Sequence, residues 1–369
     1  MDGVFSVSIL GAGPAGFALA ADLERHGTRT LVYSHPSHLQ HALSVQQIGH
    51  LKVEGVVEGI INLRITTNIA EAVAFSRIIV LAVPSSGQET LLQLLRPHSL
   101  RRHTLVAVPG NLFSIVKDSG IETGNVLETN LSPYACRMEG GVLQLYGKKR
   151  CVFISALRND AVRAAEMQAV FPGVRLRWCS SVVEVCLSNI NGVFHPLMVL
   201  MNAGRIEDTA GDFLLYRDGL TRSVANAMEA LDRARIRIGT ALGLRLRSAA
   251  EVSNECYGQH FADLVDLARN SPPHNRLRAP AGILSRNVSE DVQDLLVAWH
   301  GLAEKLGVDA SPISAVIVLV EMATGASYAE TGRNLAKLKL DGVSKEELVA
   351  RFGPAIPQRH ERQQLRIRL

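Results

Sequence analysis

Residues 6–23 combine a short apolar run, a glycine-rich turn and an apolar segment with helical spacing. The turn has the pattern Gly-x-Gly-x-x-Gly, and its glycines are Gly11, Gly13 and Gly16. In this order of strand, turn and helix, Gly11 permits the tight turn, Gly13 lets the backbone approach a pyrophosphate, and Gly16 lets the helix pack on the strand. Free N–H groups at the helix start, beside Ala15, would bind the anion. The pattern predicts a dinucleotide site.

The second expected strand, residues 29–33, narrows the choice of dinucleotide. NAD-binding proteins usually carry Asp or Glu at the end of this strand to bind the ribose 2′-hydroxyl. Here Ser34 and His35 follow the strand, and no carboxylate is present. A hydroxyl and an imidazole can bind a 2′-phosphate, so we predict NADP(H), with NAD(H) as the alternative. The competing interpretation is that His35, His38 and His41 are solvated loop residues.

Composition excludes several classes of partner. A chain of 369 residues is long enough for two domains, and 47% hydrophobic with 20% charged residues is ordinary for a globular protein. The net charge is +4, and Lys and Arg are scattered along the chain. No nucleic-acid partner is therefore expected. The basic stretch at residues 359–368 is interpreted as a solvated end.

The spacing of the cysteines and the length of the apolar runs indicate the cellular compartment in which the protein is expected. The five cysteines form no Cys-x-x-Cys pair and no metal-type spacing with histidine. This indicates reduced thiols, no metal site and a cytoplasmic location. The longest apolar runs, such as residues 78–83 and 315–320, are too short to cross a membrane. The N-terminus has no basic region before the first strand, so we expect no secretory signal.

Strand and helix patterns alternate over the first half of the chain. After the glycine turn, we expect strands at residues 62–66, 77–83 and 104–108 and helices at residues 68–75 and 88–95. Continuous apolar runs such as residues 78–83 are typical of a parallel sheet covered on both faces. Pro84 and Pro109 follow two of these strands, at the edge where open α/β sheets bind ligands. Pro84 is therefore a candidate cofactor contact.

Helical patterns dominate beyond about residue 184. The longest cover residues 219–242, 290–306 and 312–324. Glu290 and Asp291 follow Ser289 at one expected helix start, where acidic side chains complement the helix dipole. We predict an α/β fold in which a Rossmann-like, doubly wound parallel sheet (residues 1–184) precedes an all-helical C-terminal domain (residues 185–369). The two domains are expected to face each other across a cleft.

Three segments resemble the opine dehydrogenase family, and the likeness extends over nearly the whole chain. They read Thr-Asn-Leu-Ser-Pro-Tyr-Ala-Cys-Arg at residues 129–137, Ser-Asn-Ile-Asn-Gly-Val-Phe-His-Pro at 188–196 and Ser-Arg-Asn-Val-Ser-Glu-Asp at 285–291. The first segment, residues 33–35 and residues 213–221 look particularly like the crown-gall opine synthases, which make nopaline and octopine.

The resemblance implies an enzyme that joins a 2-oxo acid, such as pyruvate or 2-oxoglutarate, to the amino group of an L-amino acid such as arginine. Hydride from NAD(P)H would reduce the resulting imine to a secondary-amine dicarboxylate. In this family a histidine that opens the helical domain works with an aspartate in acid–base chemistry. The matching positions are His195 and Asp291. The implied partners are small molecules, and a homo-oligomer is left open.

The chemistry of these two side chains agrees with that role. Imine formation needs a proton acceptor for the ammonium and a donor for the departing water, and an imidazole with a pKa of about 6.5 can serve as both. A neighbouring carboxylate would fix its tautomer, in acid–base catalysis that contributes roughly 10²- to 10⁴-fold in rate. Without the resemblance, His195 is interpreted as a core histidine before a proline, and Asp291 as a charge at a helix start.

Arg286, Asn189 and Asn191 complete the candidate site. Arg286 resembles the family arginine that contacts the cofactor phosphates or the substrate, and a guanidinium holds either group bidentately. Asn189 and Asn191 are interpreted as orienting the substrate or His195 by hydrogen bonds. The competing interpretations are a solvated loop arginine and asparagines that belong to a turn or a helix start.

Two positions depart from the family pattern. Gly192 stands where family members often carry Pro, and Asn287 stands where an aromatic residue commonly follows the arginine. Both departures bear on substrate identity. Arg137 lies in the family-like string but is equally interpreted as structural. Residues 331–333 resemble a further family segment, and the sequence leaves their role open.

Two alternative functions stay open. A ketopantoate-type 2-oxo acid reductase also joins a nucleotide domain to a helical domain, but it uses a lysine as general acid. The lysines considered for that role lie in polar helical or loop contexts, and they are Lys305, Lys337, Lys339 and Lys345. A non-catalytic NADP-binding redox sensor would lack the acid–base pair or carry an added binding domain, and the sequence shows neither.

Overall fold

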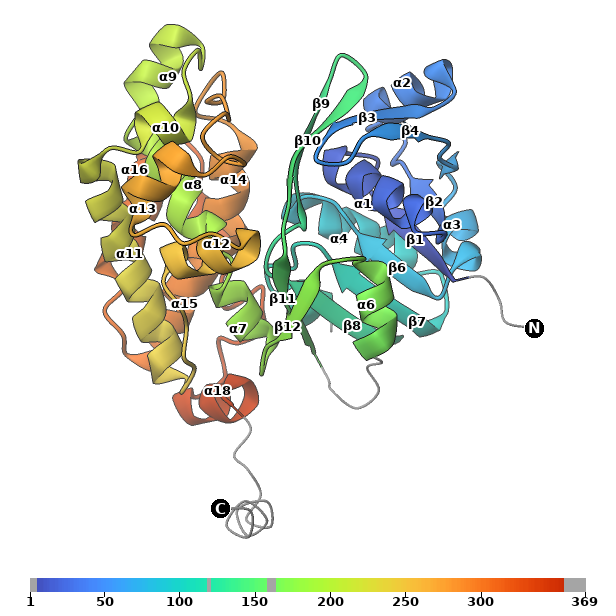
Figure 1. Cartoon of the computed structure of the whole chain (residues 1–369). Helices are drawn as coiled ribbons and strands as arrows, with labels where there is room; N and C mark the ends of the chain where they lie inside the picture. Colours follow the sequence, from blue (N-terminus) through green and yellow to red (C-terminus); the bar gives the residue numbers. More distant parts are fainter. Residues whose placement is uncertain (1–4, 118–120, 158–163, 355–369) are drawn as a thin grey trace, which may run out of the picture.

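The computed structural model describes residues 5–117, 121–157 and 164–354, which form a sheet-based part and a helical part side by side (Figure 1). The strands of the sheet-based part are β1 (Ser6–Leu10), β2 (Arg29–Tyr33), β3 (Leu51–Gly55), β4 (Gly59–Ile61), β5 (Ile65–Thr66), β6 (Ile78–Leu81), β7 (Leu100–Ala107), β8 (Thr123–Thr129), β9 (Tyr134–Glu139), β10 (Val142–Lys148), β11 (Cys151–Ala156) and β12 (Arg175–Trp178). Its helices are α1 (Pro14–Arg25), α2 (Gln40–Ile48), α3 (Ile69–Phe75), α4 (Ser85–Leu95), α5 (Phe113–Lys117) and α6 (Ala164–Val170).

The main sheet has eight strands in the order β12-β11-β8-β7-β6-β1-β2-β5. Alternate residues of its central strands point to opposite faces. Val7 and Ile9 pack with α1 and α6, whereas Leu10 packs with α3 and α4. The sheet is thus covered on both faces, as the apolar runs of its strands predict. The prediction of a Rossmann-like sheet is confirmed, and the helix at residues 68–75 begins at its expected cap, Asn68.

Two features of the sheet-based part differ from the prediction of a purely parallel sheet. First, β11 pairs antiparallel with β8, so β11 and β12 run against the other strands. Second, β4, β3, β10 and β9 form a separate four-stranded sheet that packs over α1. Its hairpin turns at Gly140 and Gly141, whose positive φ angles suit a tight two-residue turn. A glycine pair of this kind predicts a hairpin turn, and the sequence analysis did not use it.

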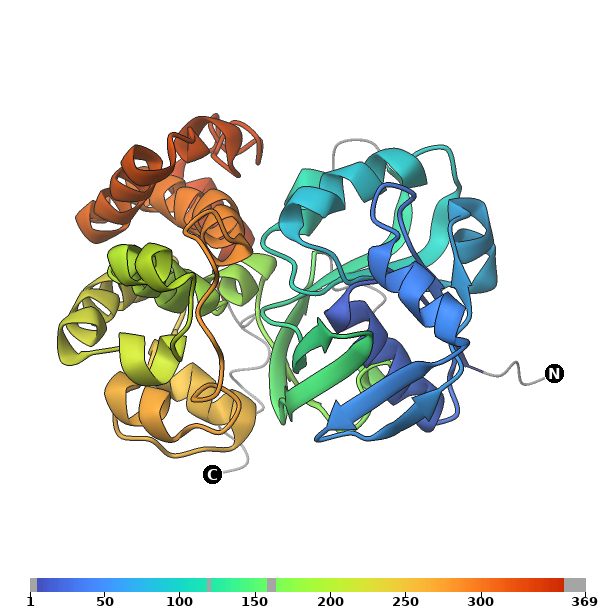
Figure 2. The same cartoon turned by 90° about the horizontal axis from the view of Figure 1, so that it is seen from above.

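The hairpin β9–β10 lies at the boundary between the two parts, as the view from above shows (Figure 2). The helical part contains α7 (Val182–Leu187), α8 (Asn191–Leu200), α9 (Ala203–Thr209), α10 (Leu215–Gly219), α11 (Arg222–Ala241), α12 (Ala249–Tyr257), α13 (Leu264–Asn270), α14 (Arg286–Asp291), the π-helical turn η1 (Val292–Leu296), α15 (Val297–Leu306), α16 (Ser311–Thr324), α17 (Tyr328–Thr331) and α18 (Lys345–Phe352). Its buried side chains form one continuous core. The basic stretch at residues 359–368 lies outside the described residues.

The helix expected at residues 290–306 begins earlier than predicted. Its cap is Ser285, and the helix runs from Arg286 through η1 into α15. Asp291 therefore lies inside a continuous helical segment, and its interpretation as a helix-start charge is wrong. A π-helical turn directly after Asp291 is a feature often found at functional sites.

The segment Val182–Leu200 is more apolar than the sequence analysis recognised. By length and composition it would be able to cross a membrane, and 83% of its most apolar window is buried inside the protein. It comprises α7 and α8, which are separated by residues 188–190. A helix that is apolar on all sides suits a buried position. In Figure 1, α8 lies among the other helices, and α7 lies at the boundary with the sheet-based part.

Gly192 in α8 packs against the indole ring of Trp299. A Cβ at position 192 would lie 2.7 Å from this ring, and Trp299 is fully buried. This contact gives a structural reason for glycine at a position where the family often has proline.

We expect Gly192→Ala to lower the free energy of unfolding by about 1 kcal/mol. Overpacking costs about 1–3 kcal/mol and outweighs a gain of roughly 1 kcal/mol in helix propensity. Gly204→Ala is the matched control, since its Cβ would meet nothing within 4 Å. Urea unfolding followed by circular dichroism measures both variants, and equal midpoints for the two would contradict the packing argument.

Candidate active site

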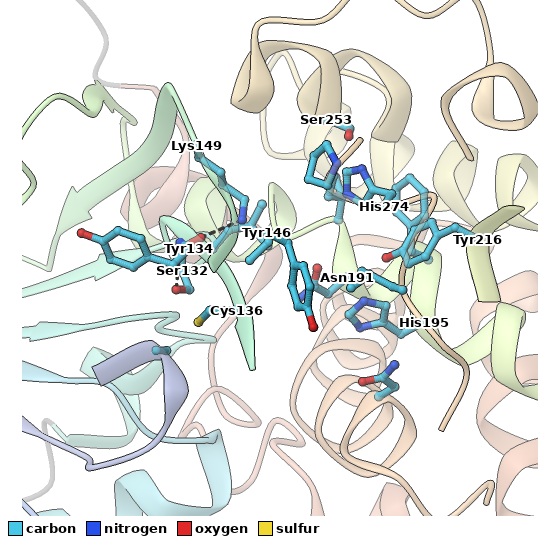
Figure 3. A pocket seen from close by; sticks show the side chains of 18 of the residues that line it. Ser132, Tyr134, Cys136, Tyr146, Lys149, Asn191, His195, Tyr216, Ser253 and His274 are labelled. Atoms are coloured by element: carbon cyan, nitrogen blue, oxygen red, sulfur yellow. Dashed lines mark hydrogen bonds between the residues drawn. The ribbon is translucent and has the colours of Figure 1, made fainter. Parts of the chain in front are cut away.

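A cavity of about 390 Å³ lies between the sheet-based part and the helical part. The sheet-based part contributes Ala15 of the glycine turn, Pro109, and side chains of the β9–β10 hairpin. The helical part contributes one face of α8, one face of α14, the end of α12, and the loop around His274. Figure 3 shows these side chains converging from both sides. The expected cleft is therefore present, and residues far apart in the chain meet in it.

His195 and Asp291 form a direct hydrogen bond in this cavity. His195 Nδ1 lies 2.6 Å from Asp291 Oδ2, although the two residues are 96 positions apart in the chain. The bond forms because α8 and α14 pack against each other. Asn191 lies four residues before His195 on the same face of α8, and both side chains line the cavity. Asn191 thus lies in the same cavity wall as His195.

Burial governs the electrostatics of this pair. Burial raises the pKa of the Asp291 carboxyl, and the neighbouring His195 opposes that rise. An ionised Asp291 accepts the Nδ1 proton of His195, which leaves Nε2 of the neutral ring without a proton. His195 Nε2 has no hydrogen bond to any part of the chain that the structure describes. The imidazole therefore presents one nitrogen to the cavity and keeps the other on the carboxylate.

The glycine turn fits a dinucleotide pyrophosphate. Gly11 has a φ of +131°, and a Cβ there would lie 2.4 Å from the carbonyl oxygen of Ala82. A Cβ on Gly16 would lie 1.8 Å from the Gly11 carbonyl oxygen, so both positions require glycine. Gly13, in contrast, faces open space and caps α1 without a side-chain hydrogen bond. The first turn of α1 beside Ala15 thus keeps its N–H groups free for an anion.

The residues after β2, which were predicted to bind the 2′-phosphate of NADP(H), agree only in part with that prediction. Ser34 is buried and its hydroxyl donates to the His38 carbonyl oxygen, so this side chain is turned away from a ligand. His35 is partly exposed and accepts a hydrogen bond from the Ser37 N–H. A carboxylate also lies nearby: Glu71 accepts a hydrogen bond from Thr66, which is the neighbour of Tyr33 in the sheet. The sequence missed Glu71 because α3 brings it there.

Helix α14 contacts both the sheet-based part, through Glu290 and Ser85, and helix α8, through Asp291 and His195. Arg286 and Glu290 are four residues apart and form an ion pair of 2.5 Å. Glu290 also accepts hydrogen bonds from the N–H and the hydroxyl of Ser85 at the start of α4. Asn287 directly follows Arg286, Asp291 directly follows Glu290, and all four residues line the cavity. Pro84 precedes this contact as the cap of α4 but does not line the cavity.

Asn189, predicted to bind the substrate, lies instead inside a polar network between the two parts. It is fully buried, and its side chain donates to the Asn111 side chain at 2.8 Å. Asn111 in turn donates to Ser85 at 2.8 Å. Asn189 also accepts the N–H of Asn191. Its role is therefore to hold the start of α8 against the sheet-based part.

Arg333 is the largest buried group in this interdomain network. Its guanidinium is fully buried and donates to the carbonyl oxygens of Gly110 and Asn111 and to the Gln88 side chain. Its Nε lies 3.6 Å from Asp294 in η1. The segment at residues 331–333, whose role the sequence left open, thus joins the helical part to the two turns that follow β6 and β7.

Lys149 is a cavity residue that the sequence analysis did not consider. Lys148 is the last residue of β10, and Lys149 directly follows it. Lys148 pairs with Asp22 at 2.7 Å, whereas Lys149 is buried at the cavity wall. The statement that no lysine suits a catalytic role considered only residues 305–345 and is corrected by this position.

Thiols and metals play no visible part in this site. All five cysteines are free, and burial raises the pKa of Cys136 and of Cys256, both in the cavity wall, to about 12. Both thiols are therefore protonated at neutral pH. Over the described ranges, no group of three or more His, Cys, Asp or Glu side chains is arranged to hold a metal ion.

Two family models match different stretches of the chain. The model described as NAD/NADP octopine/nopaline dehydrogenase, alpha-helical domain, matches residues 178–324. The model of the NAD-dependent glycerol-3-phosphate dehydrogenase N-terminus matches residues 6–131. The first stretch contains His195 and Asp291, and the second contains the glycine turn.

Whole-length relatives agree with these matches. The chain is 27% identical to a vitopine synthase of Allorhizobium ampelinum, over 93% of this chain and 98% of that protein. It is 25% identical to an opine dehydrogenase of an Arthrobacter species, over 91% and 96%. A solved structure of octopine dehydrogenase in complex with NADH and agmatine has a TM-score of 0.73 at 17% identity, over 94% and 98%. This last similarity supports the fold alone.

We predict that Asp294 makes stability depend on pH. Burial raises its pKa to about 6, against 3.8 for an ordinary aspartate, and Arg333 opposes the rise. The folded protein thus binds this proton more tightly than the unfolded chain, and stability falls as pH rises from about 4 to 6. At about 1.4 kcal/mol for each pH unit, the group accounts for up to about 3 kcal/mol.

Asp294→Asn removes this titration. The free energy of unfolding of the variant relative to the parent should therefore rise between pH 4 and pH 7, as measured by urea unfolding. Asp309→Asn is the control because Asp309 is exposed and its pKa is lowered. Parallel pH curves for Asp294→Asn and the parent would show that Asp294 does not titrate in this range.

Proposed function

We propose that this chain, which belongs to the opine dehydrogenase family, is an NADPH-dependent oxidoreductase that condenses a 2-oxo acid with the amino group of an L-amino acid. The product is a secondary amine that carries the carboxylates of both substrates. The observation that carries the proposal is the 2.6 Å contact between His195 and Asp291 in the cavity that Ala15 of the glycine turn also lines. Acid–base groups and a nucleotide site thus open into one space.

His195 is proposed to move the protons of imine formation. With Asp291 holding Nδ1–H, Nε2 takes a proton from the substrate ammonium, and the neutral amine attacks the carbonyl carbon. The same nitrogen returns the proton to the hydroxyl group that leaves as water. The buried carboxylate of Asp291 stabilises the imidazolium between these two events. Bound NADPH would supply the hydride that reduces the imine.

Arg286 and Asn191 are proposed to position the substrates. Arg286 lines the cavity and lies beside Glu290, so a substrate carboxylate or a cofactor phosphate can share its guanidinium. A guanidinium group can bind either anion through two parallel hydrogen bonds. Asn191, one turn before His195, offers a neutral amide to the reacting carbonyl. The product carries at least two carboxylates, and the basic side chains of the cavity suit them.

The choice of NADPH rests on His35 and on the surroundings of β2. The carboxylate of Glu71 lies close to the end of β2, but it accepts a hydrogen bond from Thr66 and lies 3.8 Å from Arg64. It therefore repels a 2′-phosphate less than a free acid would. We also propose a cytoplasmic location, since all five cysteines are free.

A second candidate function, a 2-oxo acid reductase, is favoured by Lys149. This buried ammonium in the cavity wall is the kind of general acid that ketopantoate-type reductases use. Such an enzyme would reduce a 2-oxo acid directly to a hydroxy acid. The two functions differ in one requirement, which is the amine.

We expect NADPH oxidation to require both an oxo acid and an amino acid. The assay follows absorbance at 340 nm with pyruvate or 2-oxoglutarate alone and then with an amino acid panel, in parallel with NADH. The mass of the product identifies the amine adduct. Oxidation at full rate without any amine would favour the reductase, and binding of NADPH without consumption in any mixture would favour a sensor.

We expect His195→Ala to lower kcat by about 10²- to 10⁴-fold, the usual range for loss of a general acid–base group. NADPH affinity, measured by fluorescence titration, should stay within about threefold because the glycine turn is untouched. His300→Ala is the matched control, since His300 lies on α15 and pairs with Glu304 outside the cavity. Near-normal turnover in His195→Ala would remove the proposed mechanism.

A further inference from the structure

Lys149 is a buried cation that has no carboxylate partner within the described part of the chain. The residue is only 8% exposed. Its ammonium donates to the Ser132 carbonyl oxygen at 2.8 Å and lies 5.0 Å from the centre of the Tyr257 ring. Burying a charge without a counterion is costly. A cation that is held at a cavity wall by one carbonyl oxygen and one ring is therefore arranged to receive an anion from a ligand.

A row of rings connects Lys149 to the catalytic pair. Tyr257 is followed by His274, with ring centres 5.0 Å apart, and His274 by Tyr216, again at 5.0 Å. Tyr216 lies 5.9 Å from Phe194, the neighbour of His195. The charges of Lys149 and of His195 both act on His274, so this ring lies near both residues.

Two neutral polar groups lie along this row. Ser253 is 1% exposed, its hydroxyl has no hydrogen-bond partner among the residues that the structure describes, and it lines the cavity (Figure 3). His274 Nδ1 is held by the Ser271 hydroxyl at 2.7 Å. Burial, helped by the charges of Lys149 and His195, lowers the pKa of His274 to about 3, so its ring is neutral. The Ser253 hydroxyl can donate to an anion that Lys149 attracts. The Ser271 hydroxyl donates to Gln259 and accepts Nδ1–H of His274, so the His274 ring serves as a neutral wall of the recess.

The acidic side chains of the cavity wall are already engaged. They are Glu290, which binds Arg286 and Ser85, and Asp291, which binds His195. The basic side chains of the wall are Arg137, Lys149, Arg278 and Arg286. A guanidinium or ammonium group on a substrate side chain would therefore meet cations without a free carboxylate in the described lining. The lining favours substrates with extra negative charge.

We propose that the recess bounded by Lys149, Ser253 and His274 binds the side chain of the amino substrate, and that this side chain ends in a carboxylate. The inference rests on the proposed condensation. The α-carboxylates of both substrates are directly attached to the reacting carbons or one bond away, so they stay beside His195 and Arg286. A carboxylate at the end of a short side chain would reach Lys149 past the His274 ring, which lies near both Lys149 and His195. The enzyme then selects acidic amino acids and rejects basic ones.

The test compares amines with pyruvate and NADPH held constant. For the parent enzyme, kcat/KM with L-glutamate should exceed the value with L-arginine by about 100-fold or more. Lys149→Met should lower kcat/KM for L-glutamate by about 10- to 100-fold, the range expected for loss of a hydrogen bond to a charged group, and change the value for L-methionine by less than about threefold. Lys149→Glu should reverse the preference towards L-arginine.

Lys52→Met is the matched control because Lys52 is exposed on β3 and pairs with Glu54; it should leave both values unchanged. An arm with 2-oxoglutarate and L-methionine asks whether the oxo acid supplies the extra carboxylate. A preference of the parent enzyme for that pair or for L-arginine would overturn the proposal. So would an equal loss for all amines in Lys149→Met, which would indicate a structural or general-acid role.

A binding measurement separates this inference from the proposed function. The NADPH complex of the parent enzyme should bind glutarate in calorimetry, and the complex of Lys149→Met should bind it at least about tenfold more weakly. If no amine supports turnover but glutarate binding depends on Lys149, the condensation fails and the anion recess stands. If turnover depends on an amine but glutarate binds both proteins equally, the recess fails and the condensation stands.

Discussion

The buried polar contact between Arg333, Glu290 and the start of α4 is the interaction on which the site depends. Arg333 donates to the carbonyl oxygens of the turn after β7, and Glu290 accepts from Ser85 in the turn after β6. Because both groups are almost fully buried, breaking either contact would leave a desolvated charge unpaired, which costs several kcal/mol. The helical part is therefore locked in the orientation that carries Asp291 to the cavity and keeps it within reach of the glycine turn.

Helical spacing lets α14 serve both the interdomain contact and the chemistry. Arg286 and Glu290 are four residues apart and face the sheet-based part, whereas Asn287 and Asp291 are displaced by one position and face α8. The first pair anchors the helix, and the second lines the cavity beside His195. Any shift of α14 along its axis would disturb both pairs together. Docking of the two parts and alignment of His195 with Asp291 are in this way one structural event.

The charge balance of the cavity agrees with a product that carries several carboxylates. Its acidic groups Glu290 and Asp291 are paired with Arg286 and His195, and Arg137 and Lys149 are basic side chains of the wall without a carboxylate partner in the described part of the chain. Such a wall raises the local concentration of anionic ligands. A bound anion then offsets part of the desolvation cost of the buried basic side chains. The neutral ring of His274 and the Ser253 hydroxyl, which has no hydrogen-bond partner among the described residues, belong to the same wall. The recess is thus suited to discriminate ligands by charge.

The sequence by itself determined the features that depend on neighbouring residues. The glycine turn is required by local backbone geometry at Gly11 and Gly16, and the apolar strand runs predicted a covered sheet. His195 and Asp291 were found by resemblance, since no spacing rule links residues 96 positions apart. The tertiary structure alone decided that Lys149 enters the cavity, because this depends on how the β9–β10 hairpin and α12 meet across the boundary. Contacts of this kind join distant segments, and their partners cannot be read from the local pattern of either one.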